Sequence, residues 1–375
     1  MQFIDLKTQQ KKIRTQIESR LNQVLDHGQY ILGPEISELE SQLAKYVGCQ
    51  HAIGVSSGTD ALLLALMCYD IGPGDAIITT PFTFISTVEV ICLLGATPVF
   101  VDIDPNTYNI DPHAIEKTVK ACHQRAINLR GILAVDLFGL PSEYDKINDI
   151  AQRHNLFVIE DAAQSFGATY YDKRACSLAD IGCTSFFPAK PLGGYGDAGM
   201  CFTNDDTQAK KIRSLMVHGQ GGHRYEHIHL GINGRLDTIQ AAILLEKFTL
   251  FPDECDARQQ VAEKYTRGLE KHFAITTPYT PDHCQSVWAQ YSIQLESSEQ
   301  RQQLQAYLKD HDIPSAIYYP IPIHQQPAFK EILYQNQSFP VAETLSNIIM
   351  SLPMHPYLSE DQQNGIIQAV LKGLG

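Results

Sequence analysis

The chain has 375 residues, of which 44% are hydrophobic and 19% are charged, so it can bury a large core and, by length, form two domains. Its formal net charge at pH 7 is -13, which excludes the basic footprint of a nucleic-acid binder. The longest apolar stretch, residues 61–68, is too short to span a membrane, and the N-terminus lacks the apolar core of a signal peptide, so we expect a cytoplasmic protein.

Apolar, β-rich segments alternate mostly with helix-like segments up to about residue 250. This alternation is typical of α/β proteins, in which helices cover a mostly parallel sheet. The predicted strands are 51–55, 75–80, 98–104, 131–139, 156–161, 183–187 and 199–204, and the predicted helices are 59–70, 86–95, 114–122, 143–155 and 207–217.

The C-terminal part of the chain has a different pattern. Residues 236–272 are expected to form long helices that leave the large domain. A smaller α/β unit follows, with a strand in 287–295, helices in 298–312 and 359–374, and a proline-rich turn at 318–327. We place the boundary near residue 250, which gives a large domain of residues 1–250 and a small C-terminal domain of residues 251–375.

Small residues follow the first predicted strand, where residues 54–58 read GVSSG. A helix begins at Thr59, and the N-terminus of a helix after such a turn favours a bound phosphate, although a plain helix cap has the same residues. The residues also fit the G-x-S-x-G nucleophile elbow, which makes an α/β serine hydrolase using Ser56 the alternative from another enzyme class. Because no glycine-rich oxyanion segment precedes this early motif, we disfavour the hydrolase.

Two polar side chains, Asp161 and Gln164, stand at the carboxyl end of the strand predicted for 156–161. Open α/β sheets place their ligands at this end. A carboxylate buried there needs a cationic partner, and a protonated pyridine nitrogen would serve, since the ion pair keeps the ring able to draw electrons from a substrate. The spacing is equally compatible with a helix cap or a salt bridge at Asp161.

One lysine, Lys190, lies in an otherwise uncharged loop rich in glycine and proline. Most lysines lie on solvated surfaces, but this one stands between Pro188 and Pro191, where desolvation would lower its pKa enough for imine chemistry. The glycines in residues 194–199 also fit G-x-G-x-x-G. A strand follows them where the dinucleotide fingerprint requires a helix, so we discard a nicotinamide cofactor.

Asn233 and Arg235 precede a long predicted helix, and four histidines lie upstream within residues 218–229. The histidine spacing lacks a matching carboxylate pattern, so we favour a flexible loop that closes over an anionic substrate and predict no metal site. The nine cysteines include no C-x-x-C pair and are expected to be reduced thiols.

Together these segments resemble the DegT family of nucleotide-sugar aminotransferases. The likeness covers nearly the whole chain and is carried by residues 56–66, 81–105, 160–168, 185–200 and 231–244, with further matches at 3–9, 32–40, 286–293 and 318–329. It implies the fold-type-I, aspartate aminotransferase-like fold of pyridoxal 5'-phosphate (PLP) enzymes, with a three-layer large domain. Ala198 stands where the family has the first of two glycines, and Gly194 where it often has cysteine, so only the subfamily is put in doubt.

The resemblance implies a role for each candidate residue. Lys190 would hold PLP as a Schiff base and then shuttle a proton between the substrate carbon and the cofactor. Asn233 would reach the cofactor phosphate of a neighbouring subunit, which implies a homodimer with shared active sites. The other implied contacts are Asp161 to the pyridinium nitrogen, Gln164 to the ring 3'-oxygen, Phe82 stacked on the ring, and Gly58, Thr59 and Ser185 to the phosphate.

Several of these residues have a plainer explanation. Phe82 would also fit as an ordinary core residue, and Ser185 as an ordinary strand residue. Arg235 either contacts the sugar or its diphosphate or anchors the start of the helix. Tyr319 and His324 stand where the family often contacts substrate, so we treat both as candidate substrate-binding residues.

The implied reaction transfers an amino group from L-glutamate to a nucleotide-linked keto-sugar for surface polysaccharide synthesis, such as O-antigen or lipopolysaccharide. The chain looks most like enzymes that aminate C3 of UDP-2-acetamido-2-deoxy-3-oxo-D-glucuronate. An uncharged UDP-3-oxo-GlcNAc, used for a lipid A diamino sugar, is the next alternative, and a C4-ketone or a dTDP-keto-sugar follows. Relatives that act as dehydratases or regulatory proteins have lost the lysine, and Lys190 argues against both here.

Overall fold

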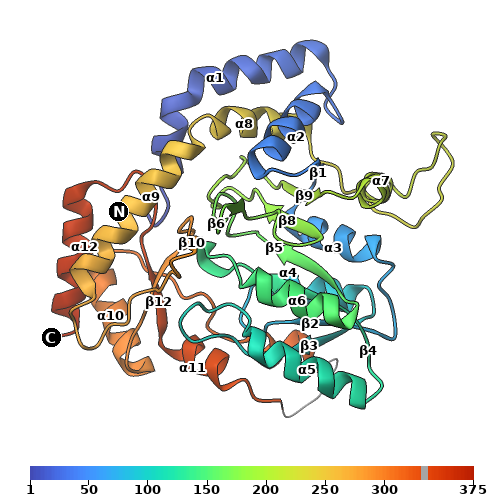
Figure 1. The fold of residues 1–375 in the computed structure, drawn as a ribbon. Helices are drawn as coiled ribbons and strands as arrows, with labels where there is room; N and C mark the ends of the chain where they lie inside the picture. The colour runs from blue at the N-terminus through green and yellow to red at the C-terminus, as the bar shows by residue number, and fades with distance from the viewer. Residues whose placement is uncertain (331–336) are drawn as a thin grey trace.

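The computed structural model describes residues 1–330 and 337–375, and its centre is a seven-stranded sheet (Figure 1). Its strands are β1 (His51–Val55), β2 (Asp75–Thr79), β3 (Thr97–Phe100), β4 (Asn128–Val135), β5 (Phe157–Asp161), β8 (Ile181–Ser185) and β9 (Gly199–Thr203). They are ordered β1-β9-β8-β5-β4-β2-β3. Neighbours from β3 to β8 are parallel, whereas β9 runs antiparallel to both β8 and β1. The mostly parallel sheet predicted from the sequence is therefore confirmed.

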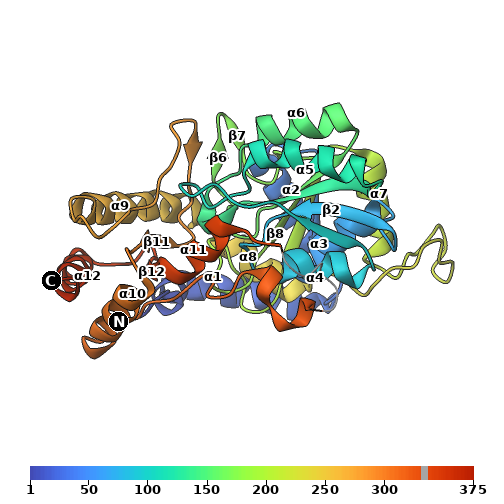
Figure 2. The same ribbon diagram turned by 90° about the horizontal axis from the view of Figure 1, so that it is seen from below.

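Helices cover both faces of this sheet (Figure 2). Ile77 packs in the cluster that faces α3 (Gly58–Cys68), α4 (Ser86–Leu93) and α7 (Asp206–Leu215). Its neighbour Ile78 packs in the cluster that faces α5 (Pro112–Gln124) and α6 (Tyr144–His154). Consecutive side chains of a strand point to opposite faces, so both faces of β2 are buried and the strand is continuously apolar.

Two N-terminal helices, α1 (Leu6–His27) and α2 (Pro34–Val47), were not predicted. α1 has a largely polar sequence and buries few side chains, so its apolar periodicity is weak. Both helices contact α8 (Thr238–Phe248), which is followed by α9 (Phe251–Leu269). The long helices predicted for 236–272 are confirmed, with a break at 249–250.

The C-terminal part has a core of its own. Strand β11 (Tyr291–Gln294) pairs antiparallel with β12 (Ile349–Leu352), which was not predicted. Helices α10 (Ser298–Asp310) and α12 (Glu360–Gly373) pack with these strands and α9 around a third hydrophobic cluster. The remaining elements are α11 (Pro340–Ile348), a short sheet of β6 (Thr169–Tyr170), β7 (Lys173–Arg174) and β10 (Cys284–Gln285), and the 3-10 turns η1 (Leu137–Gly139), η2 (Ile323–Gln325) and η3 (Pro327–Phe329).

The predicted boundary near residue 250 falls between α8 and α9. Residues from the two sides of this boundary contact one another. Ile323 and Phe339 pack in the hydrophobic cluster that contains residues of α3 and α4, and the Met354 amide donates a hydrogen bond to the Phe3 carbonyl. The division into residues 1–250 and 251–375 therefore stays a prediction.

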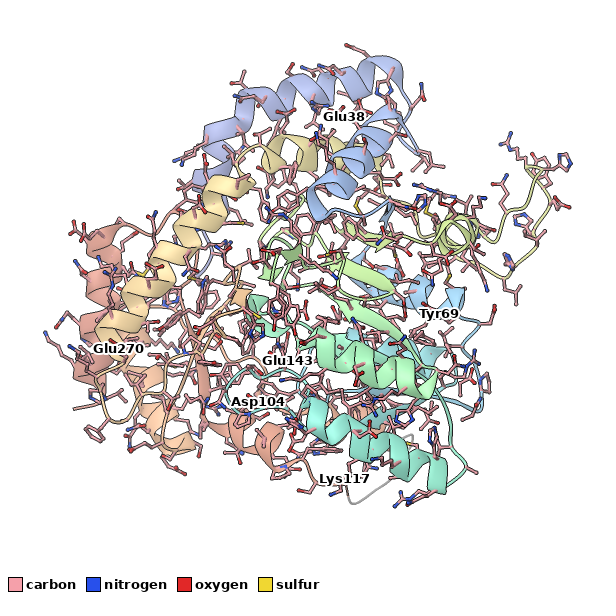
Figure 3. All side chains as sticks on the ribbon, viewed as in Figure 1. Glu38, Tyr69, Asp104, Lys117, Glu143 and Glu270 are labelled. Atoms are coloured by element: carbon pink, nitrogen blue, oxygen red, sulfur yellow. The ribbon has the colours of Figure 1, made fainter. Side chains whose placement is uncertain are left out.

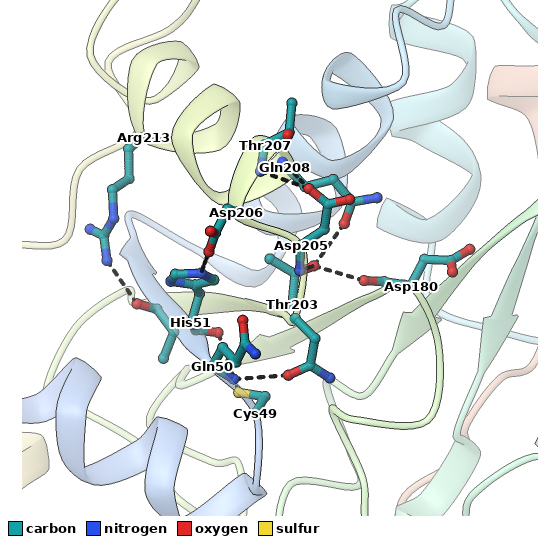
Figure 4. A network of polar contacts seen from close by, with 12 residues as sticks. Cys49, Gln50, His51, Asp180, Thr203, Asp205, Asp206, Thr207, Gln208 and Arg213 are labelled. Carbon is teal, nitrogen blue, oxygen red and sulfur yellow. Dashed lines mark hydrogen bonds and ion pairs between the residues drawn. The ribbon is translucent and has the colours of Figure 1, made fainter.

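A polar network closes the end of β1 where the strand begins (Figure 4). His51 pairs with Asp206 at 2.7 Å, and Arg213 donates to the Ala52 carbonyl at 3.1 Å. Asp205 caps α7 by accepting the amides of Thr207 and Gln208. This end fixes α7 against the sheet and leaves the opposite end of β1 for the residues of the site.

Charged side chains lie on the outside of the helical layers, as the labelled Glu38, Lys117 and Glu270 show (Figure 3). The nine cysteines are free thiols, five of them buried. None of the helices within residues 1–330 and 337–375 combines the length and the apolarity needed to cross a membrane.

Candidate active site

The candidate site lies where strands running in one direction end. Phe82 follows β2, Asp161 ends β5, Ser185 ends β8, and Gly58 follows β1. Since the carboxyl ends of parallel strands meet at one edge, residues far apart in the sequence come together there. The sheet thus brings together the residues that the sequence predicted for the ring and the phosphate of a cofactor.

The start of α3 forms the phosphate end of the site. The Ser57 hydroxyl accepts a hydrogen bond from the Asp60 amide at 3.0 Å, and the Ser57 carbonyl accepts one from the Ala61 amide. The amides of Gly58 and Thr59 precede these first helical bonds and have no acceptor within the helix. A Cβ on Gly58 would lie 2.6 Å from the Ser185 Cβ, so only glycine lets these backbones approach. A helix N-terminus with free amides beside a serine hydroxyl is suited to a phosphate.

Ser56 does not have the surroundings of a hydrolase nucleophile. Its hydroxyl donates to the Asp60 carboxylate one turn into the helix. A nucleophilic serine needs its proton directed to a base such as histidine. The serine hydrolase is therefore the weaker interpretation on geometry as well as on sequence.

Asp161 is buried, with 4% of its surface exposed. The Thr87 hydroxyl donates to its Oδ2 at 2.8 Å, and the Ala163 amide donates to its Oδ1 at 3.2 Å. Burial raises the pKa of Asp161, while these two donors and the Lys190 charge lower it. The two donors and the Lys190 charge thus oppose the effect of burial, and a carboxyl group in this apolar place is suited to pairing with a cationic ring.

Lys190 lies in the loop that connects β8 to β9. Its amide donates to the Phe187 carbonyl at 2.8 Å, and the Gly194 amide donates to the Phe186 carbonyl at 2.7 Å, so the loop folds back tightly on itself. Burial lowers the pKa of Lys190 to about 8, against the opposing effect of Asp161. A lysine with this pKa is partly neutral near pH 7 and can act as a nucleophile.

Gln164, Tyr319 and Phe82 form a connected group. The Gln164 side chain accepts the Phe138 amide at 2.7 Å and donates to the Tyr319 hydroxyl at 3.0 Å. The Tyr319 ring meets the Phe82 ring edge-on, with centroids 6.4 Å apart. Tyr319, from the C-terminal part, therefore lies beside the residues predicted for the ring.

Asn233 and Arg235 run along the outer edge of β1. The backbone of Arg235 forms an isolated antiparallel β-bridge with Val55, and the Ser56 amide donates a hydrogen bond to the Gly234 carbonyl at 3.0 Å. Asn233 is exposed, whereas Arg235 is half-buried and its Nε is buried without a hydrogen-bond partner. Arg235 therefore has an unused donor beside the phosphate end of the site.

The upstream histidines and His324 have other surroundings. His223 and His227 are exposed and His229 is half-buried in the loop that projects from the molecule (Figure 1). The described residues contain no group of three potential metal ligands. His324 is part-buried, pairs with Glu343 at 3.0 Å and packs edge-on against Phe339. The structure thus gives His324 a protein partner and leaves its predicted substrate contact untested.

Thr87 is the site residue that the sequence analysis missed. It lies in the predicted helix 86–95, and nothing in its sequence neighbourhood points to Asp161, which is 74 residues away. Thr83 stands one turn earlier, and a pair of threonines four residues apart is the one signal available in the sequence.

Comparison with known proteins identifies the relatives of this chain. Residues 11–371 match the DegT/DnrJ/EryC1/StrS aminotransferase family. The chain belongs to that family. It is 48% identical to the UDP-2-acetamido-2-deoxy-3-oxo-D-glucuronate aminotransferase of Pseudomonas aeruginosa over 96% of both chains. It is also 40% identical to the UDP-N-acetyl-3-dehydro-alpha-D-glucosamine 3-aminotransferase of Acidithiobacillus ferrooxidans, over 96% of this chain and 94% of the relative.

A solved DegT/DnrJ/EryC1/StrS aminotransferase from Brucella abortus superposes with a TM-score of 0.96 and is 45% identical over all of both chains. The resemblance, the fold class and the aminotransferase activity predicted from the sequence are thereby confirmed. The PLP cofactor is confirmed by the family and by the solved NtdA of Bacillus subtilis with bound cofactor PMP, which is 29% identical over 99% of this chain and 83% of that chain, with a TM-score of 0.90. The residues of this DegT-family site also fit PLP, because they offer a phosphate cradle, a buried carboxylate for the ring nitrogen and a lysine of lowered pKa.

Proposed function

We propose that this DegT-family protein transfers an amino group from L-glutamate to C3 of UDP-2-acetamido-2-deoxy-3-oxo-D-glucuronate, for synthesis of a surface polysaccharide such as O-antigen. The observation that carries aminotransfer is the placement of Lys190 and Asp161 at one edge of the sheet, each acting on the pKa of the other. The choice of sugar rests on the relative from P. aeruginosa that is 48% identical. The A. ferrooxidans relative makes an uncharged UDP-3-oxo-GlcNAc the second candidate.

The chemistry divides between cofactor and protein. PLP, when bound, supplies the electron sink for the substrate carbon. Lys190 would hold the cofactor covalently, and its free amine would move a proton at Nζ. Asp161 keeps the ring nitrogen protonated, and Gln164 and Phe82 orient the ring. The amides of Gly58 and Thr59 and the Ser185 hydroxyl bind the phosphate.

Arg235 is assigned to the anionic part of the nucleotide-sugar. Its buried, unpartnered Nε belongs to the segment that forms an isolated β-bridge with Val55, beside the phosphate end of the site. A guanidinium gives two parallel donors to a carboxylate or a phosphate, which an ammonium does not. Tyr319 contributes through its hydroxyl, which already meets Gln164.

The acceptor is tested most directly in the reverse direction, because 3-amino sugars are more stable than their 3-oxo precursors. We expect UDP-2-acetamido-3-amino-2,3-dideoxyglucuronate with 2-oxoglutarate to give glutamate with a kcat/KM about tenfold or more above that of the uncharged amino-glucose, because a charge-assisted contact recognises the carboxylate. A dTDP-linked amino sugar serves as the third substrate. Preference for the uncharged sugar would shift the assignment to the second candidate without affecting aminotransfer.

The protein is further proposed to be a homodimer in which Asn233 completes the partner's site. Asn233 is exposed, and two exposed apolar side chains, Ile31 and Ile239, lie near it. Ile31 forms an isolated β-bridge with Asp237, which is four residues after Asn233 and two before Ile239. Exposed apolar side chains that cluster in this way are typical of subunit interfaces.

Mixing two inactive variants tests shared sites. Lys190→Ala lacks the amine, and Asn233→Ala lacks the donor to the partner's phosphate, so each is expected to be nearly inactive alone. After subunit exchange, about a quarter of all sites should regain both residues and activity should reappear in that proportion. Mixing without recovery, while each variant elutes as a dimer on size exclusion, would place Asn233 in its own subunit's site.

A further inference from the structure

A chain of two buried hydroxyl groups ends on Asp161. Thr83 and Thr87 are 2% and 0% exposed, and Asp161 is 4% exposed. The hydroxyl oxygens of the two threonines lie 2.9 Å apart, and Thr87 Oγ1 lies 2.8 Å from Asp161 Oδ2. Thr83 precedes α4 (Ser86–Leu93), Thr87 lies in its first turn, and Asp161 is the last residue of β5.

An ionised Asp161 fixes the direction of both hydrogen bonds in this series. An ionised carboxylate only accepts, so the single hydroxyl proton of Thr87 goes to Asp161. Thr83 must therefore donate to Thr87. Hydrogen bonds in series polarise one another, which strengthens the bond to the carboxylate. The Ala163 amide occupies the other oxygen at 3.2 Å, so both carboxylate oxygens are held.

We propose that Thr87, supported by Thr83, is a positioning residue that orients the Asp161 carboxylate toward the ring nitrogen of the cofactor. The inference rests on the role proposed for Asp161. Burial alone raises the pKa of Asp161, and the Thr87 hydroxyl is the largest influence that lowers it. Without that donor, the pKa of Asp161 would rise further and one carboxylate oxygen would lose the partner that fixes its direction.

The test compares two cofactors on the purified apoprotein, with affinity as the readout. The first is PLP, and the second is its 1-deaza analogue, in which carbon replaces the ring nitrogen. Thr87→Val has nearly the same shape without the hydroxyl, and we expect it to weaken PLP about tenfold, as for a lost hydrogen bond to a charged group. The analogue should bind Thr87→Val no more weakly than the wild type, because it has no ring nitrogen for Asp161 to hold.

Two matched variants separate positioning from packing. Thr87→Ser keeps the hydroxyl and is expected to restore the affinity for PLP. Thr83→Val leaves the direct bond to Asp161 in place and should cost less than Thr87→Val. An equal loss of both cofactors in Thr87→Val, or no recovery in Thr87→Ser, would overturn the inference, because either result describes a packing defect.

Asp161→Asn distinguishes failure of this inference from failure of the role proposed for Asp161. If Asp161→Asn weakens PLP selectively and Thr87→Val does not, then Thr87 has no positioning role and the role of Asp161 stands. If Asp161→Asn weakens both cofactors equally, then the role assigned to Asp161 is itself wrong.

Discussion

Lys190→Ala is expected to abolish amino transfer, with a loss of about a thousandfold or more in the rate of the half-reaction with L-glutamate, since both the covalent link and the proton carrier disappear. The fold should persist, because the loop is held by backbone bonds such as that from the Lys190 amide to the Phe187 carbonyl. The measurement is the visible absorbance band of the covalently held cofactor, followed by a single turnover with glutamate. A variant that keeps both the band and the turnover would contradict the assignment.

Lys247 provides an unusually close control. It is 1% exposed, and burial lowers its pKa to about 8, as for Lys190. It lies on α8, however, with its Nζ over the Tyr195 ring and Glu254 as the nearby charge. Lys247→Met, which keeps most of the volume, should therefore retain the absorbance band. A lowered pKa thus does not identify the catalytic lysine, and its position at the strand ends does.

The contrast between these lysines shows what the sequence could establish. Lys190 stood out because it is flanked by prolines in a loop between two strands, and Asp161 because it ends an apolar strand. Both signals come from neighbouring residues in the sequence, so they can be recognised without a structure. Lys247 lies in an ordinary helical pattern, and the sequence has no local sign that the fold buries it.

Contacts between distant segments account for what the sequence missed. Thr87 reaches Asp161 because strand order places β4 between β2 and β5 and brings the start of α4 over the end of β5. That order cannot be read from apolar periodicity. His324 is similar: its partner Glu343 lies 19 residues on, and the pairing depends on how the proline-rich turn packs against α11.

Two buried carboxyl groups next to the site lead to the second large effect. Glu160 is 0% exposed, and its two oxygens accept the amides of Cys176 and Leu178 at 2.5 and 3.0 Å. Asp136 is equally buried, and its charge raises the pKa of Glu160. Two adjacent buried carboxylates repel, so the pair keeps one proton.

Glu160 is the member that keeps this proton. Asp136 accepts from the Ser142 amide and from the Tyr144 and Ser165 hydroxyls, which favours its ionised form. Burial and the nearby Asp136 charge raise the pKa of Glu160 well above its ordinary value, whereas burial raises that of Asp136 to about 6. Of the two carboxyl groups, Glu160 therefore has the stronger tendency to hold the proton.

This proton makes stability depend on pH in a definite direction. The folded state holds a proton that an unfolded glutamate releases, so the stabilisation is complete below the pKa of the unfolded residue and is lost as pH rises through the raised pKa of folded Glu160. Each unit of that shift corresponds to about 1.4 kcal/mol. We expect the contribution of this carboxyl group to the free energy of unfolding to fall as pH rises from mildly acidic values.

Glu160→Gln removes the titrating group and keeps a side chain of nearly the same shape. Near pH 5 the variant should be less stable by about 1–3 kcal/mol, because one of the two backbone amides, that of Cys176 or Leu178, loses its acceptor. Its stability should then change less with pH, so that the gap closes as pH rises. Urea unfolding across a pH series measures both effects, with Glu143→Gln, a part-exposed carboxylate paired with Lys146, as the control that keeps the wild-type slope. Parallel curves for the wild type and Glu160→Gln would show that Glu160 is ionised in the folded protein, and the proton would then have to be placed on Asp136.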